Sequence, residues 1–544
     1  MQKPVYKIAL LVSRPSIRFW VYRLAQLLQE RFPVEIIWIT HRHARDGSRD
    51  NLTIAAKKLE KSVFLCQPPV LAQRCSKLAS VKAIAGHELL TDLSVDLILN
   101  LSQQALDFAT YPPSCPVLCP LYHTSPEEEG LIQAILSPST VPFLAVTQQD
   151  DTILTSSLVA IPDRSLLLQA LESCFARLIS LFLRAVDHLL YGRSLAQPLP
   201  APTTPPPDTS RLFALGRLYG NRVIDMVRRR FLRDDYWYVA FWQMTSGTKA
   251  ATLAAAEPAY QVVPTGSDRF YADPFLFEHR GQLVLFVEEY RYTDPNKKGI
   301  ISCLQWDGKA FTNPRVVLER PYHLSYPFVF EADGEIYMIP ETSQNRTVEL
   351  YRATHFPDQW ELDTVLLDNL CAVDATLHFH EDRWWMFTNI AECGASSWDE
   401  LAIFYADHFK GPWVPHPMNP VKSDARSARP AGKLFYHQGR LLRPAQDCSK
   451  GYGGSVVLCE VTRLTPDQYE ETVIQTLTPD LLPSSSHGLH TLNRSQGFVV
   501  LDGKTVIPKP QFQIRNRPWV IGRRPATTLP RSRYNQAKWQ SLIG

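Results

Sequence analysis

The sequence lacks the features that mark several common classes of protein. Its ten cysteines are scattered through 544 residues without a Cys-x-x-Cys pair, which excludes a disulfide framework and favours inert thiols over a metal site even at Cys115 and Cys119. No uncharged run of about 20 apolar residues occurs, so we expect no membrane span. The net charge of only +3 argues against a dedicated nucleic-acid-binding protein.

Glycine is scarce beside proline, with 24 against 42 residues, and aromatic residues make up 11%. This mixture favours β-rich structure with proline-marked turns. The apolar run Val5–Val12 is short and leads into an amphipathic stretch, so it indicates a first strand and not a signal peptide. We therefore expect a cytoplasmic protein.

Residues 1–192 alternate strand and helix signals. Helical patterns occur at Ile17–Arg31, with Ser16 as its N-cap, and at Asp163–Tyr191. The first strand is not followed by Gly-x-Gly-x-x-Gly, so the usual dinucleotide fingerprint is absent. Short apolar runs suited to buried parallel strands lie at Ile8–Val12, Val34–Thr40, Val63–Cys66 and Val95–Leu101. The pattern predicts a Rossmann-like domain of three α/β layers.

Two segments between and after the domains are compositionally biased. Gln197–Pro207 holds six prolines and predicts an extended linker over residues 193–210. The basic helical segment 211–235 carries Arg228, Arg229 and Arg230 in a row. It suits contact with an anionic membrane surface or a phosphorylated ligand, and a solvated helix face is the alternative. The tail, residues 504–544, has nine Lys or Arg and no acid. It suits contact with membrane lipid or an anionic polymer, and a solvated or partly disordered terminus is the alternative.

From residue 236 to 503 a repeat of short strands predicts a five-bladed β-propeller. Equivalent starts fall about 47 to 59 residues apart, near the spacing of four-stranded blades. Tyr236–Gln243 is expected to supply the outer strand that closes the last blade. The five repeats begin at Tyr271, Tyr326, Val373, Arg429 and Gly488.

The first strand of each blade lines the propeller axis, which places four polar residues around one pocket: Asp273, Asp374, Arg429 and His490. The turns after the second strands add five more: Glu288, Glu289, Glu341, Asn389 and Asp447. Paired carboxylates suit glycosidic chemistry, with one as acid and the other as base or nucleophile. The alternative is that some of them pair with Arg429 or Arg443 and hold the blades together.

A dense set of phrases between Tyr271 and Gly503 resembles the propeller at the N-terminus of plant glucosamine inositolphosphorylceramide transferases and in bacterial proteins of surface-glycan loci. The matching phrases include residues 272–277, 321–330, 339–343, 373–376, 428–432 and 443–448. That domain is similar to the five-bladed propellers of arabinanases, levansucrases and invertases. The resemblance implies that Asp273 is a base or nucleophile. Those hydrolases also use an Asp on the first strand of blade two and a Glu on the first strand of blade three. This chain has Tyr326 and Asp374 at these places, which argues against plain hydrolysis.

The N-terminal domain also resembles formyltransferases of the methionyl-tRNA and sugar-nucleotide type. Their Asn-x-His-x-Ser stretch is matched by His123 and Ser125, but Leu121 replaces the catalytic Asn. Asp150 or Asp151 stands in the place of the family's Asp. Loss of an oxyanion donor costs roughly 10²–10³ in rate by analogy with other oxyanion holes, so we interpret this site as degenerate. The alternative is that this domain is a scaffold in which His123 is a core or hydrogen-bonded residue.

Together these patterns predict a carbohydrate-active protein of surface-glycan or glycolipid assembly, a transferase acting on a sugar, sugar nucleotide or glycan. Asp273 is the expected base or sugar-hydroxyl ligand and Asp374 its partner, with Glu289 and Glu341 as proton donors. Arg429 would hold a phosphate or carboxylate that His490 orients. The other expected substrate ligands are Glu288, Tyr326, Asn389 and Asp447. A glycoside hydrolase and a non-catalytic glycan-binding protein are the alternatives. No cofactor or metal is identified, and folate is not expected.

Overall fold

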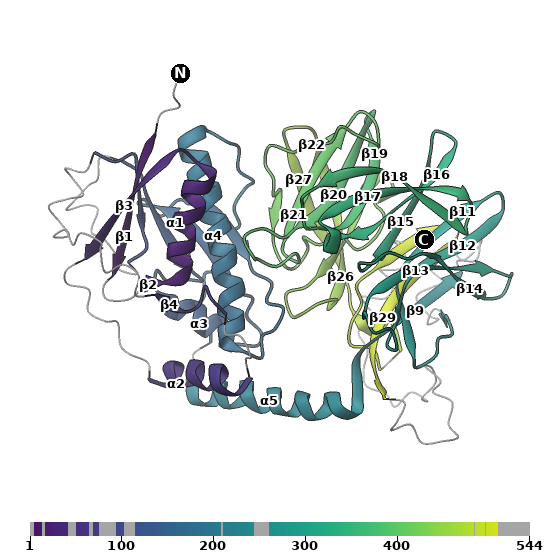
Figure 1. Cartoon of the computed structure of the whole chain (residues 1–544), viewed down its shortest axis with the longest axis horizontal. Coiled ribbons are helices and arrows are strands. Elements are labelled where there is room, and N and C mark those ends of the chain that lie inside the picture. Colours follow the sequence, from purple (N-terminus) through teal and green to yellow (C-terminus); the bar gives the residue numbers. More distant parts are fainter. Residues whose placement is uncertain are drawn as a thin grey trace. The chain divides into compact units, whose positions relative to one another are not determined.

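The computed structural model describes residues 5–13, 17–41, 51–64, 69–75, 94–102, 115–207, 210–243, 260–483, 485–495 and 497–509. The chain divides into two compact units, and the boundary lies within helix α5 (Arg211–Phe231), between Ile224 and Asp225 (Figure 1). The part of the basic tail beyond residue 509 lies outside the described residues. None of the described helices is both long and apolar enough to cross a membrane.

The first unit is built on a six-stranded sheet with the order β3-β1-β5-β6-β7-β8. The first four strands in this order run parallel, and β6, β7 and β8 pair antiparallel. The strands are β1 (Tyr6–Ser13), β3 (Val34–His41), β5 (Leu97–Asn100), β6 (Val117–Tyr122), β7 (Phe143–Gln148) and β8 (Ile153–Leu158). A layered α/β unit is therefore confirmed, although the sheet is mixed and not wholly parallel.

Helices α1 (Phe19–Arg31) and α4 (Leu167–Tyr191) pack on this sheet through the apolar faces that their spacing predicts. Trp20 of α1 stacks on Phe175 of α4 with ring centroids 5.7 Å apart. The remaining helices of the unit are α2 (Asn51–Leu59), which runs into the π-helical turn η1 (Glu60–Phe64), and α3 (Glu128–Leu136).

Several details of the predicted first domain are wrong. Val63 and Phe64 lie in η1 and not in a strand, and the Val63 side chain is 61% exposed. A run of four apolar residues cannot distinguish strand from helix end. The helix expected from Ile17 begins at Phe19, because Ile17 and Arg18 form strand β2, paired with β4 (Arg74–Cys75). The predicted cap, Ser16, lies outside the described residues.

The second unit is a five-bladed β-propeller (Figure 1). Blades one and two are sheets of four successive antiparallel strands. Blade one comprises β11 (Arg269–His279), β12 (Gln282–Arg291), β13 (Gly299–Trp306) and β14 (Phe311–Leu318). Blade two comprises β15 (Ser325–Ala332), β16 (Glu335–Thr342), β17 (Thr347–His355) and β18 (Gln359–Asp368), with the short 3-10 turn η2 (Ser343–Asn345) after β16.

Blades three and four follow the same antiparallel order. Blade three comprises β19 (Ala372–His380), β20 (Arg383–Ile390), β21 (Glu400–Ala406) and β22 (Val414–Pro415), with β23 (Lys422–Ser423) also paired to β21. Blade four comprises β24 (Phe435–His437), β25 (Arg440–Asp447), β26 (Ser455–Leu464) and β27 (Tyr469–Leu477), followed by the 3-10 turn η3 (Pro479–Leu481).

Blade five joins the two ends of the propeller. Its order is β10-β9-β29-β28, from β10 (Gln261–Val262), β9 (Leu232–Gln243), β29 (Phe498–Pro508) and β28 (Leu492–Ser495). The segment before blade one thus closes the last blade, as predicted, but β9 is its third strand and β10 is the outermost. Strand β29 continues through residues 504–508, which the sequence assigned to the tail.

Candidate functional site

The first strands of three blades share one local geometry. Asp273, Tyr326 and Asp374 have positive φ angles of 49°, 45° and 55°. Each lies where the pairing with the second strand shifts by a residue, which marks a β-bulge. A bulge re-aims the side chain it carries, and positive φ is unfavourable for residues other than glycine. The fold therefore holds these three side chains in a strained backbone at the axis.

The second strands bring further polar side chains to the same level. Ala272 pairs with Glu288, Ser325 with Glu341 and Val373 with Asn389, each just before a bulge residue. In blade four the Gln446 N–H donates to the Arg429 carbonyl over 2.7 Å. In blade five the amides of His490 and Thr491 donate to Asp502. We call the following set the axial site: Asp273, Glu288, Glu341, Asp374, Arg429, Gln446, His490 and Asp502.

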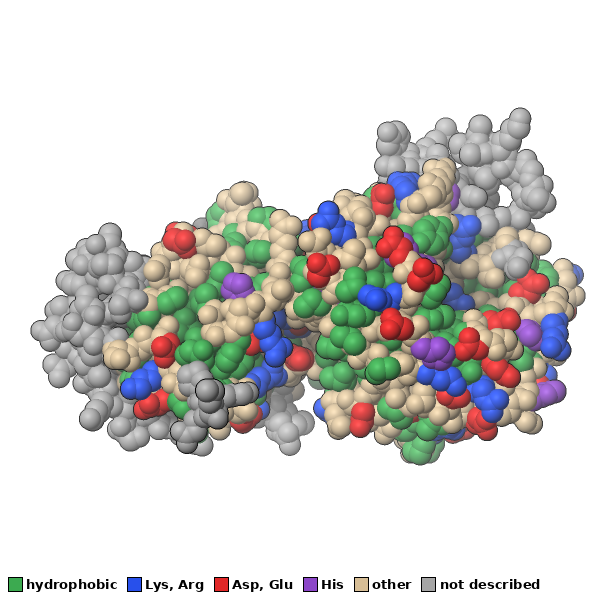
Figure 2. Space-filling model, turned by 90° about the horizontal axis from the view of Figure 1, so that it is seen from above, with side chains coloured by type: hydrophobic (Ala, Val, Ile, Leu, Met, Phe, Trp, Pro, Cys, Tyr) green, Lys and Arg blue, Asp and Glu red, His purple; other side chains and the backbone are tan. Residues whose placement is uncertain are grey.

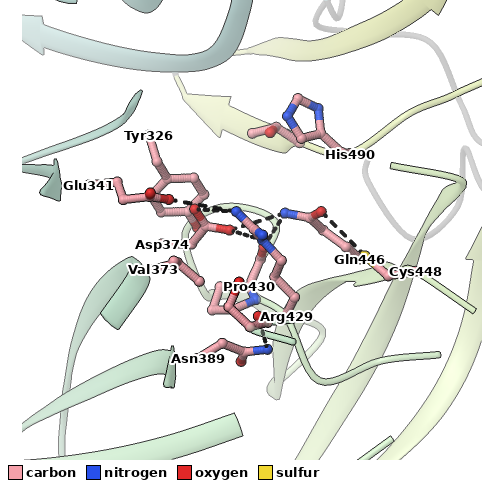
Figure 3. Close-up of polar contacts among 12 residues, drawn as sticks. Tyr326, Glu341, Val373, Asp374, Asn389, Arg429, Pro430, Gln446, Cys448 and His490 are labelled. Atoms are coloured by element: carbon pink, nitrogen blue, oxygen red, sulfur yellow. Dashed lines mark hydrogen bonds and ion pairs between the residues drawn. The ribbon is translucent and has the colours of Figure 1, made fainter. Parts of the chain in front are cut away.

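One half of the axial site is organised around Arg429, as Figure 3 shows. Its Nε lies 2.6 Å from Asp374 Oδ2, and its Nη2 lies 3.3 Å from Asp374 Oδ1 and 3.6 Å from Glu341 Oε2. Gln446 Nε2 also donates to Asp374, over 3.2 Å. The guanidinium lies over the ring of Tyr452, 5.0 Å from its centroid. Blades two, three and four are thus joined through one cation.

The other half of the axial site is organised around His490. Its Nδ1 lies 2.7 Å from Asp502 Oδ2, and its Nε2 lies 3.3 Å from Asp273 Oδ1. The Thr491 hydroxyl and the Tyr326 amide donate to the two Asp273 oxygens over 2.8 and 3.2 Å. Burial alone would lower the pKa of His490, but Asp502 and Asp273 outweigh it and raise the pKa. The two carboxylates therefore favour the charged form of the imidazole.

Five carboxyl groups of the axial site face one guanidinium and one imidazole, so not all of them can be ionised at low cost. Burial raises the pKa of Glu288 well above its ordinary value, and the negative charges of four axial carboxylates add to the effect. His323 Nε2 lies 3.6 Å from Glu288 Oε1, but burial lowers the pKa of His323, so this ring offers little compensating charge. Glu288 thus keeps its proton to higher pH than an ordinary glutamate and can donate it.

The other two first-strand acids are shifted in the same direction. Burial raises the pKa of Asp273, with the nearby positive charge of His490 opposing the shift. Burial also raises the pKa of Asp374 to about 6, with Arg429 opposing the shift and Glu341 adding to it. Raised carboxyl pKa values in a cluster indicate groups able to exchange protons near neutral pH.

Of the predicted residues, Asp273, Asp374, Arg429, His490, Glu341 and Glu288 lie together in the axial site. Glu289 does not suit the expected role of proton donor. Its carboxylate is bound by Arg269 Nη1 at 2.8 Å, by Arg291 Nε at 2.6 Å and by the Ser302 hydroxyl at 2.6 Å. Adjacent residues of a strand face opposite sides, so only one of Glu288 and Glu289 can reach the axis.

Tyr326 and Asn389 also differ from their expected role as substrate ligands. The Tyr326 side chain is fully buried, with its hydroxyl 2.9 Å from Thr376 Oγ1 and bound by the Gly432 amide at 2.7 Å. Asn389 is fully buried and donates to the Ser397 carbonyl over 3.0 Å. Both side chains therefore link segments within the propeller. Asp447 is half-buried at the end of β25.

The predicted alternative, in which candidate carboxylates pair with an arginine, is met at Arg429 by Asp374 and Glu341. Arg443 instead pairs with Glu471, which was not among the candidates. Its guanidinium is fully buried and binds both Glu471 oxygens, with Nη2 2.6 Å from Oε1 and Nε 2.8 Å from Oε2. Lys422 Nζ adds a contact of 2.7 Å to the same carboxylate. This pair joins β25 and β27 within blade four and does not reach the axial site.

The sequence interpretation missed Asp502, Gln446, Tyr452 and Trp237. Asp502 follows the predicted strand Phe498–Leu501 directly, and an acid at the end of an apolar run was the available signal. Trp237 lies on β9, and its ring centroid is 4.0 Å from that of His490. The sequence pattern placed Tyr236–Gln243 in the last blade but as its outermost strand, a position from which Trp237 would not be expected to reach His490.

One group of the axial site has the composition of a metal site. Ligand atoms of Asp273, His490 and Asp502 all lie within 4.8 Å of one another. Each carboxylate already accepts hydrogen bonds from the protein, and His490 supplies the positive charge that a metal would otherwise bring. The three residues therefore form an Asp–His–Asp triad of ion pairs.

The four residues of the formyltransferase resemblance do not form one site. His123 follows β6, and its amide donates to the Phe143 carbonyl at the start of β7. Asp150 and Asp151 follow the other end of β7. Because β7 runs antiparallel to β6, it carries the two acids to the opposite edge of the sheet, roughly 20 Å away at 3.3 Å per residue. This separation corrects the expected constellation.

His123 and Ser125 have local roles at the end of β6. Burial lowers the pKa of His123, and its Nδ1 has no hydrogen-bond partner among the described residues. Ser125 Oγ accepts the Glu127 amide over 3.1 Å. A Cβ on Gly130 would lie 2.5 Å from the Tyr122 carbonyl oxygen, so glycine is required by packing alone. These contacts agree with a scaffold.

Comparison with known proteins concerns the second unit. Residues 247–485 match the family described as glucosamine inositolphosphorylceramide transferase 1, N-terminal. A protein of that name from Oryza sativa subsp. japonica is 34% identical over 277 residues, which cover 49% of this chain and 35% of the relative. The Arabidopsis thaliana protein of the same name is 34% identical over 228 residues, covering 41% and 29%. The chain spans about a third of the length of these relatives.

Among solved structures, the chain is similar to Zg3597, a family 117 glycoside hydrolase of Zobellia galactanivorans. That match has 11% identity and a TM-score of 0.33, and covers 50% of this chain and 90% of the other. An α-L-arabinanase of Cellvibrio cellulosa matches with 12% identity and a TM-score of 0.29, covering 37% and 77%. At this level the likeness adds no argument, and the propeller rests on the strand order of the chain itself.

Proposed function

We propose that this chain is a cytoplasmic carbohydrate-active protein of surface-glycan or glycolipid assembly, and that its axial site transfers a glycosyl group. Its relatives are named glucosamine inositolphosphorylceramide transferase 1, and this name supports a transferase acting on a sugar-containing substrate. Because the chain spans about a third of those relatives, their activity as whole proteins enters only as support for the class of reaction. A sugar, sugar nucleotide or glycan is the proposed substrate.

The observation that carries the proposal is the pair Glu288 and Asp273. The two carboxyls belong to neighbouring strands of blade one, and the charge of Asp273 adds to the rise that burial causes in the pKa of Glu288. In the proposed reaction Asp273 accepts the proton of the incoming hydroxyl, and Glu288 gives its proton to the oxygen of the departing group. His490, held by Asp502, stabilises the Asp273 carboxylate.

Glu341 is the proposed sugar ligand. It is half-buried, and its Oε1 accepts from the Ser343 hydroxyl over 2.7 Å. Arg429 already binds two carboxylates, which argues against the phosphate-binding role that the sequence suggested. It is better suited to positioning Glu341 and Asp374. Tyr452 and Trp398, with ring centroids 5.3 Å apart, offer aromatic faces beside Arg429 for stacking on a sugar ring.

The test uses the full chain with a panel of sugar nucleotides and oligosaccharides. A ligand at about 100 times its dissociation constant should stabilise the protein by about 2.7 kcal/mol, which shifts the melting temperature visibly. Turnover of any ligand found is then compared between wild type, Glu288→Gln and Glu289→Gln. These substitutions change adjacent carboxyls of one strand, so the second is a matched control.

We expect Glu288→Gln to lower turnover by at least a hundredfold with the ligand still bound, since general acids contribute roughly 10²–10⁴-fold. Glu289→Gln should lower stability and leave the turnover of folded protein near that of wild type. Release of free sugar to water would instead favour a hydrolase. Ligand binding with no turnover would identify a glycan-binding protein and contradict the transferase. A response to folate would contradict the assignment of the site to the propeller.

A further inference from the structure

Helix α5 has an apolar face that none of the described residues covers. Ala214 and Leu215 are buried, whereas six apolar side chains of the same helix are 51–67% exposed: Leu212, Phe213, Val223, Ile224, Met226 and Val227. Exposed apolar side chains gathered on one helix mark an interaction site more often than scattered ones do. This helix continues through the boundary of the two units, and its own residues carry the argument.

Three contacts within the first unit fix the rotation of α5. Arg222 Nη1 lies 3.2 Å from Asp163 Oδ2, and the Tyr219 hydroxyl donates to Glu60 over 2.8 Å. Arg211 pairs with Glu129. Residues 211, 215, 219 and 222 recur at intervals of three and four and thus form one face, which is held by the protein.

The opposite face is formed by Phe213, Gly216, Gly220, Ile224, Val227 and Phe231, also at intervals of three and four; we call it the outer stripe. A Cβ placed on Gly216 or Gly220 would meet no atom within 4 Å, so the stripe is open at these two positions in the described part of the chain. Leu212 and Val223 widen the stripe on one side, whereas Met226 follows Arg222 by four residues and lies toward the held face. An apolar stripe of this width on a surface helix requires an apolar environment.

The positive charge of α5 indicates that this apolar environment is bordered by negative charge. The helix carries six arginines against one aspartate, a net charge of +5 in 21 residues. Arg228 and Arg229 have only long or exposed ion pairs, at 4.0 Å to Asp225 and 3.3 Å to Asp234. By contrast, Figure 2 shows acidic and basic side chains interspersed on the face that it presents. A basic helix with an open apolar stripe is the signature of an interfacial helix.

We propose that α5 lies in the plane of an anionic lipid membrane, with the outer stripe inserted among the acyl chains and with Arg228 and Arg230, which flank the stripe on its two sides, at the phosphate level. Arginine side chains flanking the stripe can extend to the headgroups while their methylene groups cover apolar surface. This inference stands independently of the chemistry at the axial site. It assigns the basic helical segment to a lipid surface and not to a soluble phosphorylated ligand.

The test is flotation of the full chain with vesicles of phosphatidylcholine alone, or with phosphatidylserine as about a third of the lipid. Wild type should float with the anionic vesicles. Val227→Asp should lower the partition at least tenfold, because it places a charge in the apolar stripe. Its matched control is Val365→Asp, on β18, where valine is 44% exposed against 56% at Val227. The control should float as wild type does.

Arg230→Glu tests the electrostatic part. Each arginine near an anionic surface contributes about fivefold in affinity, so the charge reversal should lower partition by about fivefold or more. Lys309→Glu, in an exposed turn of blade one, is the control and should change little. Because the substituted positions on α5 and in the controls are all exposed, we expect all four variants to keep the melting temperature of wild type. Measuring it shows that a loss of flotation does not come from unfolding.

Three results would overturn the proposal. Wild type that fails to float with either vesicle has no membrane-binding face. Equal losses in Val227→Asp and Val365→Asp would mean that the stripe has no special role. A wild-type dimer that Val227→Asp converts to a monomer, with no flotation by either, would assign the stripe to a second copy of the chain.

Discussion

The guanidinium of Arg429 in blade four lies 2.6 Å from Asp374 Oδ2 in blade three and 3.6 Å from Glu341 Oε2 in blade two. One cation therefore balances the buried carboxylate of Asp374 and the half-buried carboxylate of Glu341, which come from different blades. Removing it leaves both acids without their counter-charge, and water cannot replace that charge at the buried Asp374. The ion pairs of Arg429 thus stabilise the propeller and also oppose the rise in the pKa of Asp374.

Arg429→Met should destabilise the propeller by about 3–5 kcal/mol, the usual cost of breaking a buried pair from one side. Denaturant unfolding followed by tryptophan fluorescence measures the change. Adding Asp374→Asn to the variant should restore part of the loss, because it removes one of the stranded charges. Arg463→Met is the control, since that arginine has an exposed partner at 3.7 Å, and it should have little effect. A loss in Arg429→Met no greater than in this control would contradict the pairing.

Glu288 gives the stability of the propeller a distinctive dependence on pH. Its pKa in the folded protein is raised, so between its unfolded pKa near 4.5 and its folded pKa the folded state binds more protons than the unfolded state. The protonated Glu288 therefore contributes to the stability of the propeller at low pH, and this contribution is lost as the pH rises between the two pKa values. Relative to wild type, Glu288→Gln should gain in melting temperature as pH increases from 4.5 to 8. A difference that stays constant over this range would contradict the raised pKa.

Glu471 predicts the opposite sign. Burial would raise its pKa, but Arg443 and Lys422 outweigh burial and hold the pKa well below its ordinary value. The ionised form stabilises the fold above the unfolded pKa near 4.5, and this contribution is lost as pH falls below it. Glu471→Gln should cost several kcal/mol at pH 7, about 3–5 for a one-sided break of a buried pair, and less at pH 3. Melting temperatures at the two pH values measure the difference; an equal cost at both would contradict the assignment.

Two glycines in the chain should respond oppositely to one methyl group. A Cβ on Gly299 would lie 2.4 Å from the Leu324 carbonyl oxygen and 2.6 Å from Glu288 Oε1, so Gly299→Ala should destabilise the propeller and disturb Glu288. Gly216 lies in the interior of α5 with open space around it, and Gly216→Ala should be neutral or stabilise the helix by up to about 1 kcal/mol. Melting temperatures compare them directly. A Gly299→Ala protein as stable as wild type would show that the close approach is relieved by a small shift.

The sequence predicted the polar first-strand residues of the axial site well, because every blade presents its first strand to the axis. The alternation of buried and exposed residues along a strand could not show which of Glu288 and Glu289 faces the axis. Seven consecutive residues of β12 are buried, and the bulge after Ala272 changes which side chains face the axis. The outermost strands of the blades were not predicted because they have too few buried residues. Strand β18, for example, is mostly exposed and shows no alternating apolar pattern. The antiparallel course of β7 likewise separates His123 from Asp150, which depends on topology and not on spacing.

The closure of blade five yields a final prediction. Tyr238 on β9 is fully buried and lies near the Ser486 hydroxyl, although 30 residues separate it from the start of blade one at Arg269. Removing its ring leaves a cavity between β9 and β29, so Tyr238→Ala should destabilise the propeller by about 3–5 kcal/mol, as aromatic truncations in cores do. Tyr436→Ala, where the side chain is 53% exposed, should cost far less. Limited proteolysis of the variant should cut first within blades one and five, because an open ring exposes the strands on both sides of the closure. Cleavage confined to the first unit would contradict a role for β9 in holding the propeller closed.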